Sequence, residues 1–342
     1  MSDDAGGHRT RPSAAEQTLA LDIARQIGRS AAAVDHLGGE DNRVFRVHGD
    51  GGPDHVIRFP ADAVPDVLDV PGGTEASAGT AGGSEDHFAT ELWAMRRATT
   101  AGIPTTSVVD RGVCRGVPYL VLDHIAPAAP TTATATAAAD RERAWHWLGR
   151  YARDLAAVRV DHPPPALLTR FGPDLPAAWR RHLAYNRDAL DDADPLLADG
   201  AYRPADRTVL RDVVDRLARG AFTFGLAHHD LAPRNLVLRP GSAPPVLIDW
   251  GAVTLGPTPW TDVGRVYRWT VCDRIVDRRD YDTFARAARV DRPEDEVLLA
   301  RLTALHLLDV TRWARDQSPD LYPQYLRDCA SGLGAVLPRL GP

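Results

Sequence analysis

One segment, from His228 to Gly251, constrains the fold more than any other stretch of the chain. It reads HHDLAPRN, then two short apolar runs separated by a Pro-Gly turn, and then IDWG. Apolar runs joined by such a turn predict a turn-and-strand unit. The spacing HxDxxxxN fixes Asp230 and Asn235 on the preceding loop, and Asp249 follows the second apolar run. The pattern therefore predicts that these polar side chains share one rigid support.

The residue types of this segment suit phosphoryl transfer. That reaction needs little covalent chemistry from the protein, so catalysis reduces to positioning the attacking oxygen and neutralising phosphate charge with Mg²⁺. Asp230 is placed to accept a hydroxyl proton, and Asn235 and Asp249 offer the hard oxygen ligands that suit Mg²⁺. The alternative is that Asp230 and Asn235 are turn residues and that Asp249 merely ends a strand. The complete set in register favours the catalytic interpretation.

A glycine-containing hairpin near the N-terminus fits the same chemistry. Residues Leu37 to Val47 read LGGEDNRVFRV, in which two glycines precede a strand with a period of two residues. We expect backbone N–H groups around Gly38, Gly39 and Asn42 to cover the phosphates of a nucleotide. A glycine pair alone is more often an ordinary turn, so this interpretation depends on its neighbours.

The following strand, His55 to Phe59, carries a cation near its end. The chain has no lysine, so all 40 basic residues are arginines and the usual phosphate-binding lysine cannot exist. Arg58 is the candidate in its place, because arginine stays charged and can fork onto phosphate oxygens. We expect Glu91, on the amphipathic helix that follows, to pair with Arg58. The alternative is that Glu91 is an ordinary solvated helix residue.

These segments together resemble the aminoglycoside phosphotransferase family, a branch of the protein-kinase-like fold that includes choline and fructosamine kinases. The resemblance spans most of the chain and rests on the motifs GGEDNRVFRV, VIRFP, TELWAMRRATTAGIPTTSVV, GVPYLVLDHI, HHDLAPRN, IDWG and WTDVGR. It implies an α+β, bilobal protein-kinase-like fold. The small N-lobe would hold an antiparallel sheet and a helix, and the large C-lobe would be mostly helical.

The resemblance also implies a role for each residue of the site. Asp230 would be the catalytic base, Asn235 and Asp249 the Mg²⁺ ligands, His228 a brace for the loop, and Asp262 its support from the following helix. Backbone groups of Asp123 and Ile125 would contact adenine.

The chain departs from the family pattern at three positions. His229 replaces the more usual glycine or arginine, Ala232 stands where histidine is frequent, and Arg58 replaces lysine. These changes keep the catalytic residues in place. They leave both ATP and GTP open as the phosphate donor.

The sequence predicts three regions. Residues 1–14 are expected to be a disordered tail, residues 15–125 a nucleotide-binding N-lobe, and residues 126–342 a C-lobe with the catalytic loop and acceptor-binding helices. Within the N-lobe, residues 61–84 are rich in Gly, Ser, Thr and Ala, which predicts a flexible insertion. A second spacer is expected over residues 126–139.

Composition excludes several classes of function. A chain of 342 residues with 44% hydrophobic content can bury the cores of two lobes. No membrane span is evident and the polar start lacks a secretory signal, so we expect a cytoplasmic protein. Three scattered cysteines without a CxxC pair argue against disulfides and structural zinc. A net charge of −6 and dispersed arginines argue against nucleic acid as a partner.

The acceptor is the least determined part of the prediction. The leading hypothesis is an ATP- or GTP-dependent phosphotransferase that phosphorylates a hydroxyl of a small molecule, such as an aminoglycoside or related antibiotic. The alternatives are a tailoring kinase acting on Ser or Thr of a biosynthetic peptide, and a nucleotide-binding pseudokinase.

Two features of the sequence bear on that acceptor. The acidic balance suits a cationic molecule, but the aspartate-rich runs 188–194 and 273–282 are more simply solvated faces. Tyr267, Trp269 and Trp313 are candidates for stacking on a substrate ring, although aromatic residues at helical spacing usually belong to the core.

Overall fold

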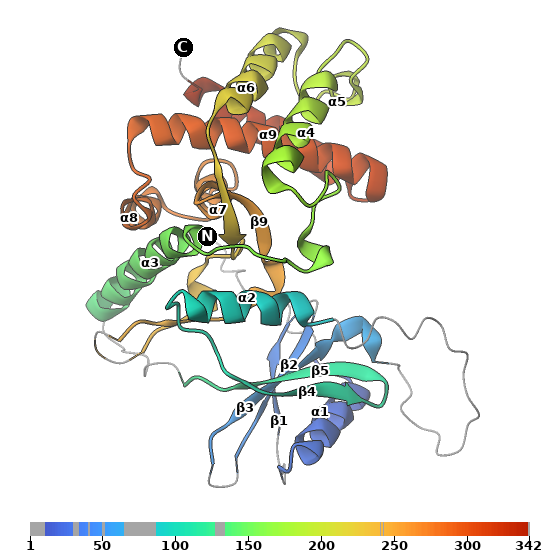
Figure 1. Cartoon of the computed structure of the whole chain (residues 1–342), viewed down its shortest axis with the longest axis vertical. Helices are drawn as coiled ribbons and strands as arrows, with labels where there is room; N and C mark the ends of the chain where they lie inside the picture. The colour runs from blue at the N-terminus through green and yellow to red at the C-terminus, as the bar shows by residue number, and fades with distance from the viewer. Residues whose placement is uncertain are drawn as a thin grey trace, which may run out of the picture. The chain divides into compact units, whose positions relative to one another are not determined.

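The structure is a computed structural model that describes residues 11–29, 34–39, 42–49, 52–64, 87–126, 134–239, 241 and 243–340. The chain divides into two compact units, and Figure 1 colours both along the sequence. One unit takes in residues 1–92 and 105–127, and the other residues 93–104 and 128–342. The division lies close to the expected boundary after residue 125. It differs in that residues 93–104, from the middle of the expected N-lobe, belong to the second unit.

Most of the expected tail and insertion lies outside the described residues, namely residues 1–10 and 65–86. Regular structure nevertheless begins inside the expected tail, because helix α1 (Ala14–Gln26) starts at Ala14. Its N-terminus is a capping box. The Ser13 hydroxyl accepts the Glu16 N–H at 3.1 Å, and the Glu16 carboxylate accepts the Ser13 N–H at 2.7 Å.

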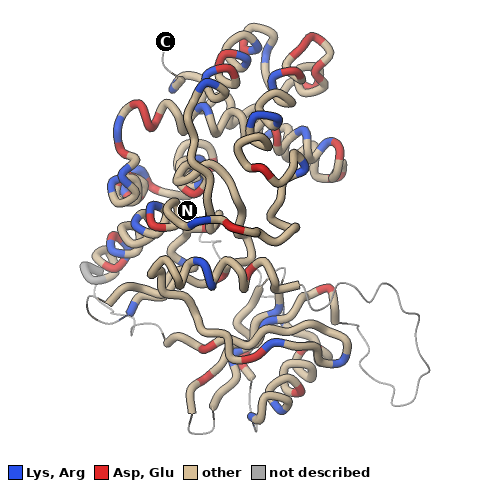
Figure 2. The backbone as a smooth tube through the Cα atoms, in the orientation of Figure 1, with Lys and Arg blue, Asp and Glu red and all other residues tan. Residues whose placement is uncertain are grey.

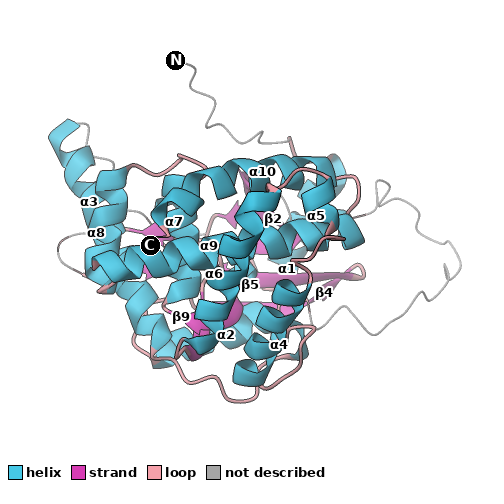
Figure 3. Cartoon of the chain, turned by 90° about the horizontal axis from the view of Figure 1, so that it is seen from above, coloured by secondary structure: helices cyan, strands magenta, loops and turns pink. Residues whose placement is uncertain are grey.

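The first unit is built on a five-stranded antiparallel sheet in the order β1-β2-β3-β5-β4. Strands are drawn in magenta in Figure 3, where β4 and β5 are labelled. The strands are β1 (Val34–Gly38), β2 (Asn42–Val47), β3 (His55–Pro60), β4 (Val108–Cys114) and β5 (Val117–Asp123). Phe45, Ile57 and Val121 form one buried core with Leu19 and Ile23 of α1. An antiparallel sheet with a helix is the expected architecture of the small lobe.

The second unit is mostly helical, as expected for the large C-lobe. Its helices are α3 (Thr134–Ala156), α4 (Leu175–Asp188), α5 (Pro195–Ala198), α6 (Arg207–Arg219), α7 (Trp260–Val271), α8 (Arg278–Ala288), α9 (Pro293–Gln317) and α10 (Tyr322–Val336). Two short sheets accompany them, formed by β6 (Thr223–Ala227) with β9 (Thr254–Thr258) and by β7 (Leu236–Val237) with β8 (Val246–Leu247). Helix α2 (Ala89–Thr100) crosses the division between the units. None of the described helices is long and apolar enough to cross a membrane.

The expected spacer over residues 126–139 is shorter than predicted. Helix α3 begins at Thr134, so residues 134–139 are helical. The sequence there is TATAAA, and alanine has the highest helix propensity while no glycine or proline interrupts the run. Residues 127–133 lie outside the described part of the chain.

Close packing of α3 against α8 depends on Gly149. A Cβ at this position would lie 2.1 Å from the carbonyl oxygen of Phe284, so only glycine lets the two backbones approach. One turn earlier, the ring of Trp145 meets the ring of Phe284 edge-on, with 6.2 Å between centroids. Together these contacts place α3 beside α8.

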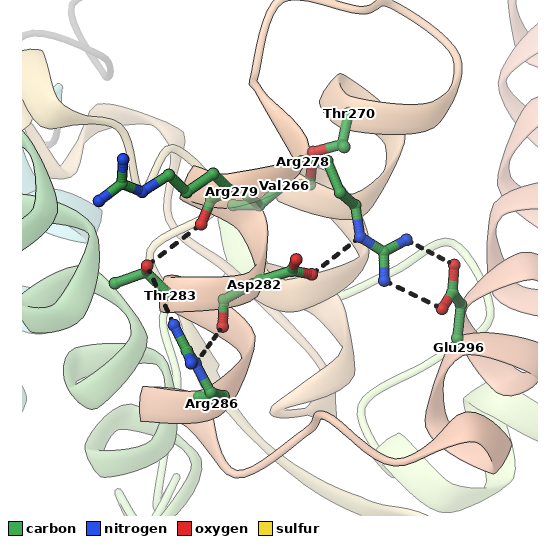
Figure 4. A network of polar contacts seen from close by, with 8 residues as sticks. All are labelled: Val266, Thr270, Arg278, Arg279, Asp282, Thr283, Arg286 and Glu296. Atoms are coloured by element: carbon green, nitrogen blue, oxygen red, sulfur yellow. Dashed lines mark hydrogen bonds and ion pairs between the residues drawn. The ribbon is translucent and has the colours of Figure 1, made fainter.

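The aspartate-rich runs take part in ion pairs that join the helices of the second unit. Arg278 links α8 to α9, because it contacts Asp282 at 2.8 Å and Glu296 at 2.9 Å (Figure 4). Asp194 is buried and contacts Arg312 at 2.7 Å. Further pairs are Asp192 with Arg207 and Asp280 with Arg141. Figure 2 shows basic and acidic residues interleaved along these helices, so the runs have a structural explanation.

Candidate functional site

The predicted turn-and-strand unit is present in the second unit. Strands β7 and β8 pair antiparallel, with Leu236 opposite Leu247. Just beyond this pair, the Ile248 N–H donates to the Asn235 carbonyl oxygen at 2.9 Å. This register places Asn235 opposite Ile248 and therefore close to Asp249. The arrangement is the one that the apolar runs and their turn predict.

Asp230 lies on the loop after β6, where its side chain is 13% exposed and held by its own loop. Arg234 donates to both carboxylate oxygens at 2.7 Å. Asn235 Nδ2 donates to the Asp230 carboxylate at 2.7 Å and to its backbone oxygen at 2.9 Å. Because the amide nitrogen of Asn235 is committed to Asp230, its Oδ1 is the atom that remains for a metal.

His228 is fully buried and links the loop to β8. Its Nε2 donates to the Ile248 carbonyl oxygen at 3.1 Å, and its Nδ1 accepts the Asp230 N–H at 3.3 Å. The two partners require the neutral ring with its proton on Nε2. Burial lowers the pKa of His228 to about 4, in agreement with a neutral ring. The structure therefore gives His228 the bracing position expected of it.

Asp262, in the first turn of α7, holds the same loop through two hydrogen bonds. Its two carboxylate oxygens accept the backbone N–H groups of His228 at 3.1 Å and of His229 at 2.7 Å. Burial raises the pKa of Asp262 to about 7, and the two N–H donors act in the opposite direction. His229 has a φ of 63°, a left-handed conformation that suits the glycine more usual here.

Asp249 follows β8 on an exposed position with a φ of 62°. Such a conformation is uncommon for a residue with a Cβ, although aspartate adopts it more readily than most. The negative charges of Asp230 and Asp249 both act on the pKa of His228, so both carboxylates lie within electrostatic reach of that ring.

The oxygens of Asn235 and Asp249 fit Mg²⁺, which prefers hard ligands and usually takes one or two from the protein and the rest from phosphates and water. The described residues hold no group of three or more His, Cys, Asp or Glu arranged around a metal.

In the first unit, the expected pairing of Arg58 with Glu91 is confirmed. Arg58 lies on β3 opposite Val44 and Leu120, and its guanidinium contacts the Glu91 carboxylate of α2. Both side chains are buried. Since two buried charges must compensate each other, the pair fixes the direction of the guanidinium.

The glycine hairpin is also present, as β1 and β2. Gly38 and Gly39 both have a φ of 110°, and a Cβ on Gly39 would lie 1.9 Å from the Asn42 carbonyl oxygen. Asn42 begins β2, and its side-chain oxygen lies 3.4 Å from His87 Nε2. Arg43 Nη1 donates to the Gly39 carbonyl at 2.9 Å. The tip, residues 40–41, lies outside the described chain.

Asp123 and Ile125, the residues expected to contact adenine, lie at and just beyond the end of β5. The Asp123 N–H already donates to the Ser107 carbonyl at 3.0 Å, which leaves only its carbonyl for a ligand. The backbone of Ile125 makes no hydrogen bond to the rest of the described chain. Within the described residues, the Ile125 N–H therefore has no acceptor.

Next to the loop, the second unit contains a pocket of about 160 Å³ that the sequence did not reveal. Its walls come from α4, the loop after β6, β9, α7 and α9. We call it the basic pocket because two arginines line it. Its aromatic and basic side chains are Trp179, His229, Trp260, Arg265, Arg268 and His306. These residues lie far apart in the sequence, and the local spacing of motifs gives no sign of them.

The aromatic residues expected to stack on a substrate lie elsewhere. Tyr267 and Trp269 are buried, as their helical spacing in the sequence indicates for core residues. Trp313 is exposed and meets Tyr325, with 6.2 Å between ring centroids. None of the three lines the basic pocket, where Trp179 and Trp260 provide the aromatic surface.

Solved structures with the same fold include three transferases. The ADP-bound aminoglycoside phosphotransferase APH(2'')-Ib is 11% identical, with 93% of this chain and 98% of that chain covered and a TM-score of 0.57. The GDP complex of aminoglycoside 2'-phosphotransferase-IIIa is 16% identical (93% and 97% covered, TM-score 0.57). Macrolide 2'-phosphotransferase MphH from Brachybacterium faecium is 18% identical (93% and 97% covered, TM-score 0.55).

No curated protein sequence matches the chain. A family model, by contrast, matches residues 33–299, and it describes the phosphotransferase enzyme family, APH. Because that match covers most of the sequence, the chain belongs to the phosphotransferase enzyme family.

Proposed function

We propose that the protein transfers the terminal phosphate of ATP or GTP to a hydroxyl group of a small molecule. The observation that carries the proposal is the cluster around Asp230. Its carboxylate is oriented by Arg234 and Asn235, and the β7–β8 register sets Asn235 opposite Ile248, the residue before Asp249. A base beside two hard oxygen ligands is the arrangement that phosphoryl transfer requires.

In the proposed mechanism, Asp230 accepts the proton of the attacking hydroxyl. Asn235 holds the Asp230 carboxylate in place through Nδ2, while His228 and Asp262 fix the backbone of the loop. A fixed base positions the acceptor oxygen without reorganising during the reaction. Arg234 must yield at least one carboxylate oxygen to the acceptor, because it contacts both in this structure.

The metal and the nucleotide have their own proposed ligands. Mg²⁺ would be held by Asn235 Oδ1 and Asp249, and when bound it neutralises phosphate charge. Arg58 would contact the phosphates, with Glu91 fixing its direction. Gly38, Gly39 and Asn42 would cover the phosphates from the hairpin.

The base of the nucleotide would be contacted by the Asp123 carbonyl and the Ile125 N–H. This part of the proposal is supported by the Ile125 N–H, which has no acceptor in the part of the chain that the structure describes. Solved structures of similar fold are described with either ADP or GDP bound, so both donors stay in the proposal.

Hydroxyl-bearing antibiotics are the first acceptors to examine. Structures of similar fold are described in complex with spectinomycin and with hygromycin B, and another is a macrolide 2'-phosphotransferase. At such low identity the likeness extends to the fold alone.

Nucleotide turnover tests the proposal directly. The full chain is incubated with Mg²⁺ and ATP or GTP, with and without a panel of hydroxyl compounds, and mass spectrometry follows added phosphate and released nucleoside diphosphate. We expect transfer to at least one acceptor, or slow hydrolysis by water, and its loss when EDTA removes the metal. A chain that binds nucleotide but shows neither reaction would be a pseudokinase, and the proposal would be wrong.

A further inference from the structure

The basic pocket opens beside the proposed catalytic base. His229 lines it and directly precedes Asp230 in the chain. The charge of Asp230 also acts on the guanidinium of Arg265, so the pocket and the carboxylate are electrostatically coupled. Trp269 lies between the two regions, with the guanidinium of Arg234 6.0 Å and that of Arg265 5.2 Å from its ring centroid. A molecule in this pocket is therefore close to the base.

Two arginines of the pocket lack carboxylate partners. Within the described residues, Arg265 and Arg268 make no ion pair, and Arg265 Nε is buried without a hydrogen-bond acceptor. Other arginines of the second unit, such as Arg278 and Arg312, are bound to acidic residues. The N–H donors of these two neighbouring guanidinium groups on α7 are thus available to a ligand in the pocket.

Among the described residues, the one carboxylate that lines the pocket, Asp309, already has polar partners. Asp309 lies 3.1 Å from His182 Nε2 and 3.4 Å from Arg170 Nη2, and it accepts a hydrogen bond from Asn186 at 3.1 Å. These contacts lower the pKa of Asp309 against the effect of burial. A cationic ligand would therefore find no free negative charge on this wall.

The remaining polar groups of the pocket are mostly donors. Trp179 Nε1 is buried without an acceptor, and Trp179 and Trp260 supply flat apolar surface. Burial and the two arginines lower the pKa of His229 to about 4, so its ring is neutral at pH 7. A cavity of similar size holds one benzene ring, so a single ring with a small substituent fits.

From this arrangement we propose that the basic pocket receives the acceptor through an anionic group, a carboxylate or a phosphate ester, carried on a ring. Guanidinium forks bind such groups through charge-assisted hydrogen bonds, while the indole rings cover the ring faces. The inference rests on the proposed function, since it names the acceptor class of the same site. The anionic acceptor proposed here differs from the cationic acceptor that the acidic composition suggests.

The test measures binding without nucleotide, by isothermal titration calorimetry on the full chain at low ionic strength. Four probes share one ring and differ in charge: 4-(hydroxymethyl)benzoate, phenyl phosphate, benzyl alcohol and benzylamine. We expect the two anions to bind at least tenfold more tightly than benzyl alcohol, and benzylamine to bind more weakly still. The ratio between the anions shows whether carboxylate or phosphate is preferred.

Two pocket variants and one control locate the binding. Arg268→Gln and Arg265→Gln are each expected to weaken anion binding roughly tenfold, since each removes one charge-assisted contact. Arg327→Gln, on the exposed face of α10, should leave it unchanged. Thermal melting confirms that each variant is folded, and the comparison of probes on the unmodified protein does not depend on any variant.

Three results would overturn the inference. They are benzylamine binding as tightly as the anions, anions binding no better than benzyl alcohol, or an anion preference that survives both pocket substitutions. None of these results contradicts the proposed function, which depends on nucleotide turnover. Conversely, anion binding without any turnover would remove the proposed function and leave the pocket as an anion site.

Discussion

At the scale of single residues, the loop after β6 holds its side chains through unusual backbone geometry. His229 and Asp249 have φ values of 63° and 62°. Each such conformation costs about 1–3 kcal/mol and persists only where the surroundings fix it. The sequence motif predicted which residues converge here, because the spacing HxDxxxxN and the Pro-Gly turn are local. It could not predict the support from Asp262, because this residue accepts the His229 N–H from a helix much later in the sequence.

The Asp262 carboxylate should be necessary for both stability and turnover. In Asp262→Asn one oxygen becomes an amide nitrogen, so one of the buried N–H groups of His228 and His229 loses its acceptor. We expect the free energy of unfolding to fall by about 1–3 kcal/mol. Urea titration measures this change, with the exposed Asp328→Asn as the control. Equal losses in both variants would contradict the role given to Asp262.

The buried His228 predicts a pH dependence of stability. Its pKa is about 4 in the folded protein and 6.5 as the ordinary value, so below pH 6.5 the unfolded chain binds the proton more tightly. This contribution is complete above pH 6.5 and is lost as pH falls towards 4, by up to about 3 kcal/mol.

The comparison with His228→Gln isolates this residue, because glutamine can still donate to Ile248 but does not titrate. The advantage of the wild-type protein over the variant in urea titrations should shrink between pH 6.5 and pH 4. Other titrating groups, including Asp262 with its raised pKa, contribute equally to both proteins. An advantage that stays constant or grows as pH falls would be inconsistent with a neutral, buried ring.

At the scale of elements, periodicity and turn chemistry predicted the glycine hairpin and the strand over residues 55–59, and the family resemblance implied the antiparallel sheet and the helical second unit. The start of α3 was missed because an alanine-threonine run reads as a spacer by composition and as a helix by propensity. The basic pocket was missed for a different reason. Its walls come from α4, α7 and α9, and no local pattern records which faces of distant helices meet.

The contact between α3 and α8 should tolerate no side chain at position 149. Gly149→Ala would place a Cβ 2.1 Å from the Phe284 carbonyl oxygen, so the helices must separate. We expect a destabilisation of about 1–3 kcal/mol. The control is Gly334→Ala in α10, where a Cβ meets nothing within 4 Å and alanine should stabilise by roughly 0.5–1 kcal/mol. If thermal melting shows both variants to be stabilised, the packing described for α3 is wrong.

The ion pair between β3 and α2 should contribute more to the free energy of unfolding than a pair on the surface. Glu91→Gln removes the carboxylate that contacts the buried Arg58, at a cost on the order of 3 kcal/mol. We expect nucleotide affinity to fall as well, since the guanidinium loses its fixed direction. The exposed pair of Arg279 with Glu142 provides the control variant Glu142→Gln. Unfolding and nucleotide titrations that do not distinguish the two variants would argue against this role.

At the scale of the whole molecule, the family match extends over residues 33–299 and so includes parts of both units. The first unit carries the groups proposed to bind nucleotide. The second carries the proposed base, the metal ligands and the basic pocket. Donor binding is therefore proposed for the first unit, and acceptor binding with proton removal for the second.

The proposal depends above all on Asp230 as the group that removes the acceptor proton. The turnover of Asp230→Asn at saturating nucleotide tests this most directly. The matched control is Asp212→Asn, because Asp212 pairs with Arg216 at the same spacing on an exposed helix. We predict that kcat falls roughly 10²- to 10⁴-fold for Asp230→Asn, with nucleotide affinity unchanged and the control fully active. A variant that keeps the wild-type kcat would contradict the account.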